Sequence, residues 1–216
     1  MGNVFFTADL HIRHKNILRH SKGRIEGMNL KDENDILGHD KYIIDMWKEM
    51  TKRGDHIYIL GDFIMSSQSE AAYLLNQLKL NGCRLHLIVG NHDKATKTMT
   101  NMFESIDLIK QVKFKKTVFP FIEEENFNCI LCHYPLLSWQ DKPRGSINLY
   151  GHVHANALFI DDEPDLRFNV GLDNPKSNYR LFSLEDIYTF YKNKLDGLSP
   201  TEYIEKASRE NKYFVR

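Results

Sequence analysis

The chain has 216 residues, and its 29 Lys and Arg residues are balanced by 29 Asp and Glu residues, which gives a formal net charge of zero. A chain of this length fits one domain and buries roughly 70% of the surface that its unfolded form exposes. A balanced charge creates no global field that would hold a long nucleic acid without regard to sequence. We therefore expect no long nucleic acid as a partner, although a local basic groove stays possible.

Cysteine usage and hydropathy bear on the compartment. The chain has only three cysteines and no apolar N-terminal stretch flanked by positive charge, a combination typical of a reducing, intracellular setting. Its apolar runs are all shorter than a membrane span, and Phe6 stands where a myristoylation motif needs Ser or Thr. We expect a cytoplasmic protein without a lipid anchor. Cys129 and Cys132 have redox-motif spacing, but strand residues three apart point to opposite faces, which favours two packed thiols.

The first half of the chain alternates short apolar runs with helical patterns. Residues 4–6, 57–60 and 84–89 are near-continuous apolar runs, typical of strands that are buried on both faces. Between them, residues 31–52 and 69–79 carry apolar side chains at helical spacing. This alternation predicts right-handed βαβ crossovers and a mainly parallel sheet.

After residue 110 the pattern becomes rich in β-strands. Residues 112–121 and 127–132 predict a hairpin, and residues 147–150, 157–160 and 166–170 predict further strands. We expect a second, mixed sheet packed on the first with helices outside, which is a four-layer α/β/β/α sandwich.

Two helices are predicted at the end of the chain, after the capping residues Ser183 and Ser199. We expect one domain over residues 1–198, followed by a peripheral helix and tail over residues 199–216.

Polar residues that can bind metal follow five of the predicted strands. Five of the ten histidines lie in these positions. Carboxyl ends of neighbouring parallel strands meet at one edge of a sheet, so these side chains should converge. The pattern consists of Asp9-Leu10-His11, Gly61-Asp62, Gly90-Asn91-His92-Asp93, His133 and Gly151-His152-Val153-His154.

The chemistry of this set indicates a divalent metal. Imidazole and carboxylate ligands suit Mn, Fe, Zn or Ni, whereas a structural zinc site is richer in thiolates. Asp-x-His and His-x-His place two side chains on the same side of an extended segment, so that one metal can contact both. We expect divalent metal at this set, with Mn²⁺ preferred.

The order of these residues resembles the calcineurin-like metallophosphoesterase superfamily over residues 4–154, and in detail its small bacterial and phage phosphohydrolases. The resemblance implies that Asp62 bridges two metals and that His92 is the catalytic histidine, assisted by Asp93. A hydroxide shared by the metals would attack phosphorus in line, without a phosphoenzyme. One metal would be held by Asp9, His11, Asp62 and His154, and the other by Asp62, Asn91, His133 and His152.

Other residues are assigned on weaker patterns. His14, Arg13 and Arg144 are candidates for binding the substrate phosphate, since a guanidinium group can pair with two phosphate oxygens. Met65 follows the Asp62 segment and is a candidate for an apolar wall of the site. The remaining histidines are expected to be surface or packing residues: His20, His39, His56 and His86.

The sequence thus predicts a phosphohydrolase acting on a small phosphomonoester, phosphodiester or nucleotide. The segment after Asp62 lacks the second Asp of the protein Ser/Thr phosphatase branch, which argues against that branch. A nuclease or repair enzyme acting on short oligonucleotides is the alternative. A non-catalytic scaffold of the same fold is a second alternative, although all the ligand positions are filled. The oligomeric state is left open.

Overall fold

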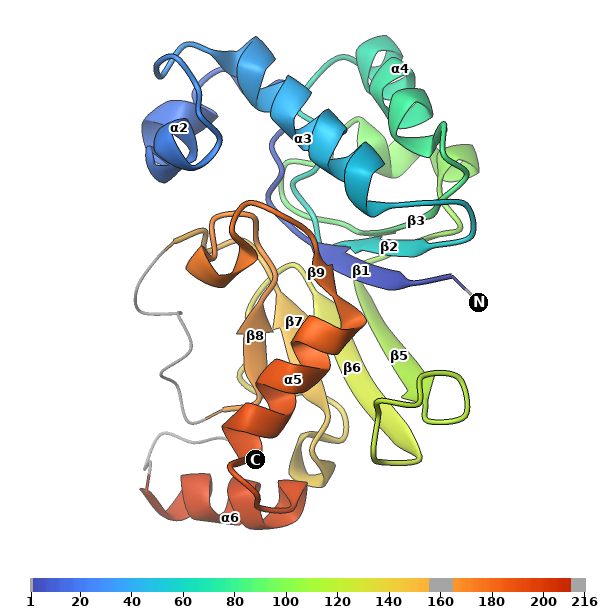
Figure 1. Cartoon of the computed structure of the whole chain (residues 1–216), viewed down its shortest axis with the longest axis vertical. Coiled ribbons are helices and arrows are strands. Elements are labelled where there is room, and N and C mark those ends of the chain that lie inside the picture. The colour runs from blue at the N-terminus through green and yellow to red at the C-terminus, as the bar shows by residue number, and fades with distance from the viewer. Residues whose placement is uncertain (1, 156–164, 211–216) are drawn as a thin grey trace.

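Two β-sheets form the centre of the structure, and helices cover their outer sides (Figure 1). The computed structural model describes residues 2–155 and 165–210. Within these ranges one sheet has the strand order β4-β3-β2-β1-β9 and the other has the order β5-β6-β7-β8. The predicted architecture of two mixed sheets flanked by helices is confirmed. The strand predicted over residues 157–160 lies outside the described residues.

The first sheet is mainly parallel, as the alternation of strands and helices predicts. β1 (Val4–Thr7) pairs with β2 (His56–Ile59), β2 with β3 (Arg84–Ile88) and β3 with β4 (Ser105–Asp107), all in parallel. β9 (Phe182–Ser183) adds to the free side of β1 in the antiparallel direction. All four residues of β1 are buried, in agreement with a strand that is covered on both faces.

The crossover helices α3 (Ile36–Met50) and α4 (Gln68–Lys79) lie over the first sheet (Figure 1). Both begin after a capping side chain, since Asp35 and Ser67 each accept a hydrogen bond from a backbone N–H three residues on. The cap at Asp35 explains why α3 begins later than the predicted residue 31.

Two short helices precede α3 and were not predicted. They are α1 (Ile17–His20) and α2 (Gly23–Gly27). Each is too short for a periodic apolar pattern to show in the sequence.

The second sheet contains the predicted hairpin. β5 (Ile109–Lys115) pairs antiparallel with β6 (Asn126–Cys132), and β7 (Ile147–Tyr150) and β8 (Arg167–Asn169) continue the sheet in parallel. The prediction that the first strand of the hairpin spans residues 112–121 is wrong at both ends. Its C-terminal part leaves the ladder because the chain turns after Lys115, whose carbonyl oxygen accepts the backbone N–H groups of Val118 and Phe119 at 2.9 Å.

Aromatic contacts connect the layers. The ring of Phe6 in β1 meets that of Phe114 in β5 edge-on, with centroids 6.1 Å apart, which joins the two sheets. Helix α5 (Leu184–Leu195) packs on the second sheet, where the rings of Tyr188 and Phe127 lie 5.3 Å apart. Cys129 and Cys132 are free and buried within this arrangement, as expected for packed thiols.

The last described helix, α6 (Pro200–Glu210), lies beside the 3-10 turn Lys142–Arg144. Ile204 of α6 is 3% exposed and belongs to the core cluster that includes both sheets. The division into a domain over residues 1–198 and a peripheral tail stays a prediction. Among the described residues, the longest helices fall short of the length and apolar character that a membrane crossing requires.

We predict that Ile204→Ala lowers the free energy of unfolding by roughly 2–5 kcal/mol, because it removes a buried aliphatic side chain that attaches α6 to the core. Urea denaturation followed by far-UV circular dichroism measures this change. Glu205→Ala, an exposed neighbour on the same helix, is the control. Equal stabilities of the two variants would mean that α6 does not contribute to the core in solution.

Candidate metal centre

The predicted ligands lie in the loops that follow β1, β2, β3, β6 and β7. Within each sheet these strands are parallel, so their carboxyl ends lie together. The structure brings six of the seven predicted ligands into two groups whose ligand atoms lie within 4.8 Å of one another. Cluster one contains Asp9, His11 and His154, and cluster two contains Asp62, His133 and His152.

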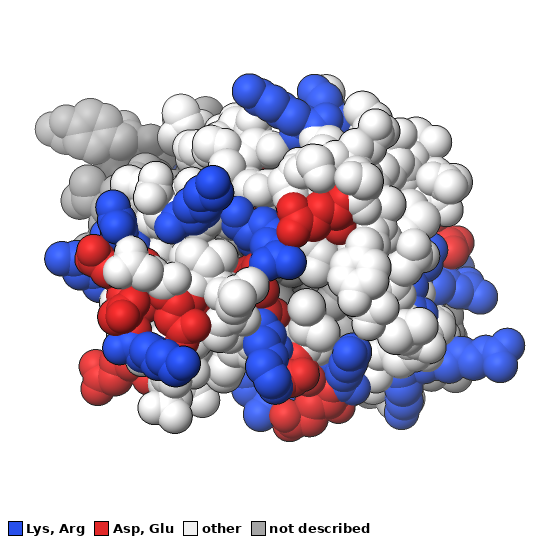
Figure 2. Space-filling view, turned by 90° about the horizontal axis from the view of Figure 1, so that it is seen from above, with Lys and Arg blue, Asp and Glu red and all other residues white. Residues whose placement is uncertain are grey.

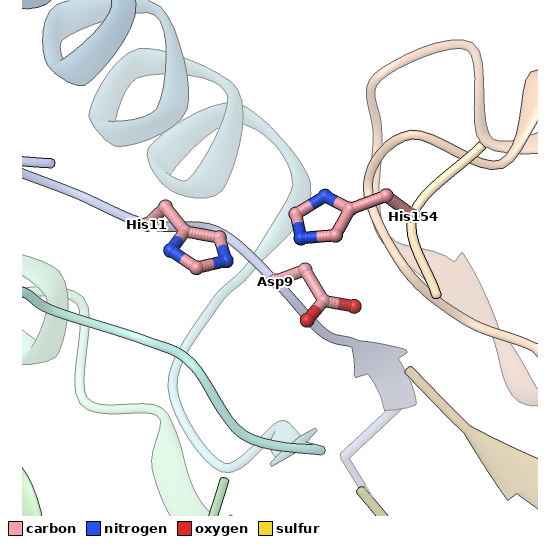
Figure 3. A group of neighbouring side chains, drawn as sticks. All are labelled: Asp9, His11 and His154. Atoms are coloured by element: carbon pink, nitrogen blue, oxygen red, sulfur yellow. The ribbon is translucent and has the colours of Figure 1, made fainter. Parts of the chain in front are cut away.

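Cluster one combines residues from both sheets. Asp9 and His11 come from the segment after β1 and His154 from the loop after β7, and Figure 3 shows the three side chains directed toward a common space. Oδ2 of Asp9 accepts a hydrogen bond from the backbone N–H of His152 at 2.8 Å. Oδ1 of Asp9 and Nε2 of His11 are buried and lack a hydrogen-bond partner in the described part of the chain. Two buried acceptor atoms are thus left facing the centre of the cluster.

The protonation state of His11 in cluster one suits metal binding. Burial, with the Arg24 charge as the next cause, holds the pKa of the His11 imidazole far below its usual 6.5, so that the ring is neutral. A neutral imidazole is the form that coordinates a cation. Burial raises the pKa of the Asp9 carboxyl to about 6, which shows how costly its negative charge is in this environment. A cation at the centre of the cluster would remove that cost.

In cluster two a backbone carbonyl group fixes the orientation of the His133 ring. Its Nδ1 lies 2.7 Å from the carbonyl oxygen of Leu60 and donates to it, so that Nε2 is the acceptor nitrogen of the neutral ring. That Nε2 faces two further acceptors, Oδ1 of Asn91 at 3.0 Å and Oδ2 of Asp62 at 3.6 Å. Asn91 therefore joins cluster two as expected. In the neutral ring, Nε2 and these two oxygens all offer lone pairs toward the same space.

Asp62 lies between the two clusters. Its Oδ1 accepts the backbone N–H of His92 at 2.8 Å, which sets the orientation of the carboxylate. Its Oδ2 is 3.7 Å from Nε2 of His11 in cluster one and 3.6 Å from Nε2 of His133 in cluster two. One oxygen atom thus faces both sets of imidazoles, which is the position of a ligand shared between two cations.

Five of the ligands have a left-handed backbone, which most residues other than glycine avoid. The φ angles are 56° at Asp9, 51° at His11, 53° at Asp62, 71° at His152 and 51° at His154. Such strained residues persist where the surrounding structure holds them, and they concentrate at functional sites. The sharp turns let the chain direct successive side chains into the centre of the site directly after each strand.

These observations test whether the residues fit a divalent cation. The donor set consists of carboxylate, amide oxygen and neutral imidazole, with all three cysteines elsewhere. Buried acceptors that face one another are destabilising unless a positive group lies between them. The two clusters therefore fit first-row divalent metals, as the sequence predicts.

Sequence reasoning missed Asp173, which orients His154. Asp173 lies three residues after the end of the predicted strand over 166–170, so the rule that polar ligands follow strands would have found it. Its Oδ2 accepts from Nδ1 of His154 at 2.6 Å, which turns Nε2 of the ring toward cluster one. Although burial opposes the charge on His154, this hydrogen bond and the nearby carboxylates raise the pKa of the imidazole above 6.5.

Arg24 of α2 is the second missed residue, and it gave no sequence signal. Its side chain is fully buried and holds the backbone of the ligand segment, donating to the carbonyl oxygens of Asp9 at 2.6 Å and Leu10 at 3.0 Å. It also donates to both oxygens of Asp173 at 2.8 Å, and to Nε2 of His39 at 2.9 Å. Burial by itself would raise the pKa of Asp173, but Arg24 keeps it well below its ordinary value. Arg24 thus fixes the position of cluster one through contacts to both sheets.

Asp93 has a different role from the predicted one. It was expected to orient the His92 ring, but it is 1% exposed and both its oxygens accept hydrogen bonds from elsewhere. The donors are the backbone N–H groups of Asp62 at 2.9 Å, Phe63 at 3.0 Å and Gly90 at 2.8 Å, and Oγ1 of Thr96 at 2.9 Å. Four bonds use the acceptor capacity of the carboxylate. Asp93 therefore ties the Asp62 loop to the loop of Asn91.

The three predicted phosphate-binding residues have different surroundings. The His14 ring lies 5.3 Å from that of His11 and 6.5 Å from that of His92, beside cluster one. Arg13 pairs with Glu70 at 2.8 Å and Asp40 at 3.5 Å, so its guanidinium is already engaged by carboxylates.

Arg144 lies in the turn that precedes β7, at the opposite end of that strand from His152 and His154, and pairs with Asp141 at 2.7 Å. Its assignment to the site is wrong, because the sequence places it near the motif while the length of β7 separates the two. Met65, proposed as an apolar wall, does contact the site, with its Sδ 3.2 Å from Nδ1 of His11.

The fold and the site define a class of protein, an α/β two-sheet protein with a mixed nitrogen and oxygen metal centre at its strand ends. Residues 2–196 match the family described as calcineurin-like phosphoesterase, and the chain belongs to this family. Membership and the two clusters support a metal-dependent phosphoesterase.

Relatives in phages and archaea match most of the chain. The Gene 66 protein of Mycobacterium phage L5 is 25% identical and is aligned over 87% of this chain and 93% of its own length. The Gene 66 protein of Mycobacterium phage D29 is 25% identical, over 80% of this chain and 89% of its own. The uncharacterized protein MJ1445 of Methanocaldococcus jannaschii is 27% identical, over 86% and 89%. The phage relatives agree with the resemblance to a small bacterial and phage subgroup.

A solved structure shares the fold. The crystal structure of the protein of unknown function AQ665 from Aquifex aeolicus has a TM-score of 0.64 and 21% identity, and the match covers 88% of this chain and 99% of that one. This similarity bears on the fold alone.

We predict that Arg24→Met weakens metal binding at cluster one by ~10–100-fold and leaves cluster two nearly unchanged. The hydrogen bonds of Arg24 support the segments of cluster one and, among the described residues, none of them reaches a ligand of cluster two. Calorimetric titration with Mn²⁺ measures the affinities. Arg19→Met, an exposed residue of α1, is the control.

Asp173→Asn tests the same contact with a smaller risk of unfolding, since it keeps the shape of the side chain. This variant should weaken metal binding at cluster one. An equal loss of affinity at both sites, in protein whose circular dichroism is native, would contradict a specific role of this pair.

Proposed function

We propose that the protein hydrolyses small phosphoesters with two divalent cations, one at each cluster. The observation that carries this proposal is the position of Asp62, whose Oδ2 lies within 3.7 Å of Nε2 of both His11 and His133. A carboxylate oxygen shared by two sets of imidazoles suits the cation pairs that stabilise both the attacking and leaving oxygens of a phosphoryl displacement. Mn²⁺ is our choice of metal, with Fe, Zn or Ni as alternatives, because such ligands accept several ions.

The chain's own groups hold and orient this centre. Backbone N–H groups of His152 and His92 direct the carboxylates of Asp9 and Asp62. When bound, the cations supply Lewis acidity toward a phosphoryl oxygen and lower the pKa of a water molecule. Asp62 would be shared, while the other ligands divide into Asp9, His11 and His154 on one side and Asn91, His133 and His152 on the other.

His92 is our candidate for the group that protonates the leaving oxygen. Its side chain is exposed at the mouth of the site, and its ring centroid lies 5.7 Å from that of His11. Its backbone is held by Asp62, so the ring is placed beside the metal centre without being part of a cluster. An imidazole in this position can act as a general acid toward a leaving oxygen. The His14 ring next to it is proposed to contact the phosphoryl group.

A small substrate is favoured over a long nucleic acid. Figure 2 shows one face of the molecule, on which basic and acidic side chains are interspersed. The described residues of this face therefore form no continuous basic track. The overall charge balance has the same consequence, since phosphate contacts dominate affinity for nucleic acids. A phosphomonoester, phosphodiester or nucleotide is therefore the proposed substrate class.

Asp62→Asn is expected to abolish metal-dependent hydrolysis of p-nitrophenyl phosphate and bis(p-nitrophenyl) phosphate. A neutral amide cannot replace the charge that the shared carboxylate provides to two cations. Release of p-nitrophenol in protein reconstituted with Mn²⁺ measures the activity, and Asp45→Asn on the exposed side of α3 is the control. Unchanged activity of the Asp62 variant would remove this residue from the bridging position.

His92→Ala should leave metal binding intact and reduce the maximal rate by ~10² or more, because only the proton transfer is lost. Steady-state kinetics combined with metal analysis by mass spectrometry separates the two effects. If the variant only binds metal more weakly, and turns over normally at saturating metal, the proposed role of His92 is wrong.

A further inference from the structure

A cavity of about 360 Å³ borders cluster one at His154. Its volume lies in the range of small-molecule sites, roughly 300–1,000 Å³. Residues from three separate segments line it, and those used below are His20, Ser21, Lys22, His154, Asp173 and Tyr179. Because His154 belongs both to cluster one and to the wall of the cavity, a ligand in the cavity would lie next to the metal centre.

The charged groups in this cavity favour an anion. Lys22 is exposed and forms no ion pair with the residues that the structure describes. The one carboxylate of the wall, Asp173, is already neutralised. Its oxygens accept hydrogen bonds from Arg24, His154 and Ser21. The wall of the cavity therefore carries the ammonium group of Lys22, while the carboxylate of Asp173 is already compensated by its hydrogen bonds.

Imidazole rings connect the cavity with cluster one. The centroid of His14 is 5.3 Å from that of His11, and His20 follows at 6.2 Å from His14 in a stacked arrangement. His20 was expected to be a surface or packing residue, but it lines the cavity. Its imidazole offers an N–H donor on the wall that Lys22 shares.

Tyr179 also lines the cavity, and its ring packs closely on glycines of α2. A Cβ atom on Gly27 would lie 1.8 Å from Cε2 of Tyr179, so a side chain at this position would displace the ring. Tyr179 itself has a left-handed backbone with φ 56°. Close packing of this kind gives a preformed wall with a hydroxyl group at the edge of the cavity.

We propose that this cavity binds a second phosphate group of the substrate, so that compounds with two phosphates are preferred over simple monoesters. This inference rests on the proposed function, since the first phosphate would be bound at the metal centre. Lys22 supplies the charge, while His20 and Tyr179 supply hydrogen-bond donors. Charge-assisted hydrogen bonds of this kind are the stronger ones in proteins.

The test compares alkane bisphosphonates of increasing chain length with alkylphosphonates of the same chain length. Each is titrated by calorimetry into Mn²⁺-loaded protein and used as an inhibitor of p-nitrophenyl ester hydrolysis. We expect one chain length at which the bisphosphonate binds ~10-fold or more tightly than its monophosphonate, since one charge-assisted contact has about this effect. In Lys22→Gln and His20→Gln this ratio should fall toward one.

Lys113→Gln, an exposed lysine on β5, is the matched control and should keep the ratio of the wild type. A ratio near one at every chain length, or a high ratio that Lys22→Gln and His20→Gln leave unchanged, would overturn the assignment of the cavity. Failure of the proposed function is seen separately, as absent metal-dependent hydrolysis, because calorimetry reports binding in either case.

Discussion

The convergence of hydrogen-bond acceptors at the strand ends is the constraint on which the rest of the site depends. Oδ2 of Asp62 lies 3.6 Å from Nε2 of His133, both on buried side chains, and Oδ1 of Asp9 and Nε2 of His11 are buried nearby without a hydrogen-bond partner among the described residues. Acceptors removed from water in this way destabilise a fold unless a cation compensates them. The arrangement is therefore understandable as a binding site and not as packing.

Two buried charged residues hold this arrangement, one beside each cluster. Arg24 fastens the segment of Asp9 to Asp173, and so brings the first sheet and the loop after β8 together at cluster one. Asp93 fastens the backbone of Asp62 to the loop that begins at Gly90. Both charges are fully hydrogen-bonded, which is the condition under which a buried charge is tolerated. The left-handed residues of the site persist because these contacts hold the chain in place.

Chemistry and specificity then belong to different parts of the molecule. The ligands come from the ends of five strands, which position them rigidly, whereas one side of the cavity beside His154 is formed by the short helices α1 and α2 and their connection. Loops on a rigid scaffold are where substrate recognition usually varies. Under the two proposals made above, the metal centre would determine the kind of bond that reacts, and His20, Lys22 and Tyr179 would determine which phosphorylated compound is bound.

The sequence by itself determined the two-sheet fold and which residues gather at its edge. Buried strands are visible as apolar runs, and residues directly after parallel strands must share an edge, so Asp9, Asp62 and His133 could be identified without coordinates. Only the tertiary structure decided the roles of Arg24, Asp173 and Asp93 and excluded Arg144. These roles depend on contacts between segments that are far apart in the chain, such as the 149 residues between Arg24 and Asp173. Local patterns report burial and periodicity, but they contain no information on which distant backbone groups a buried side chain will meet.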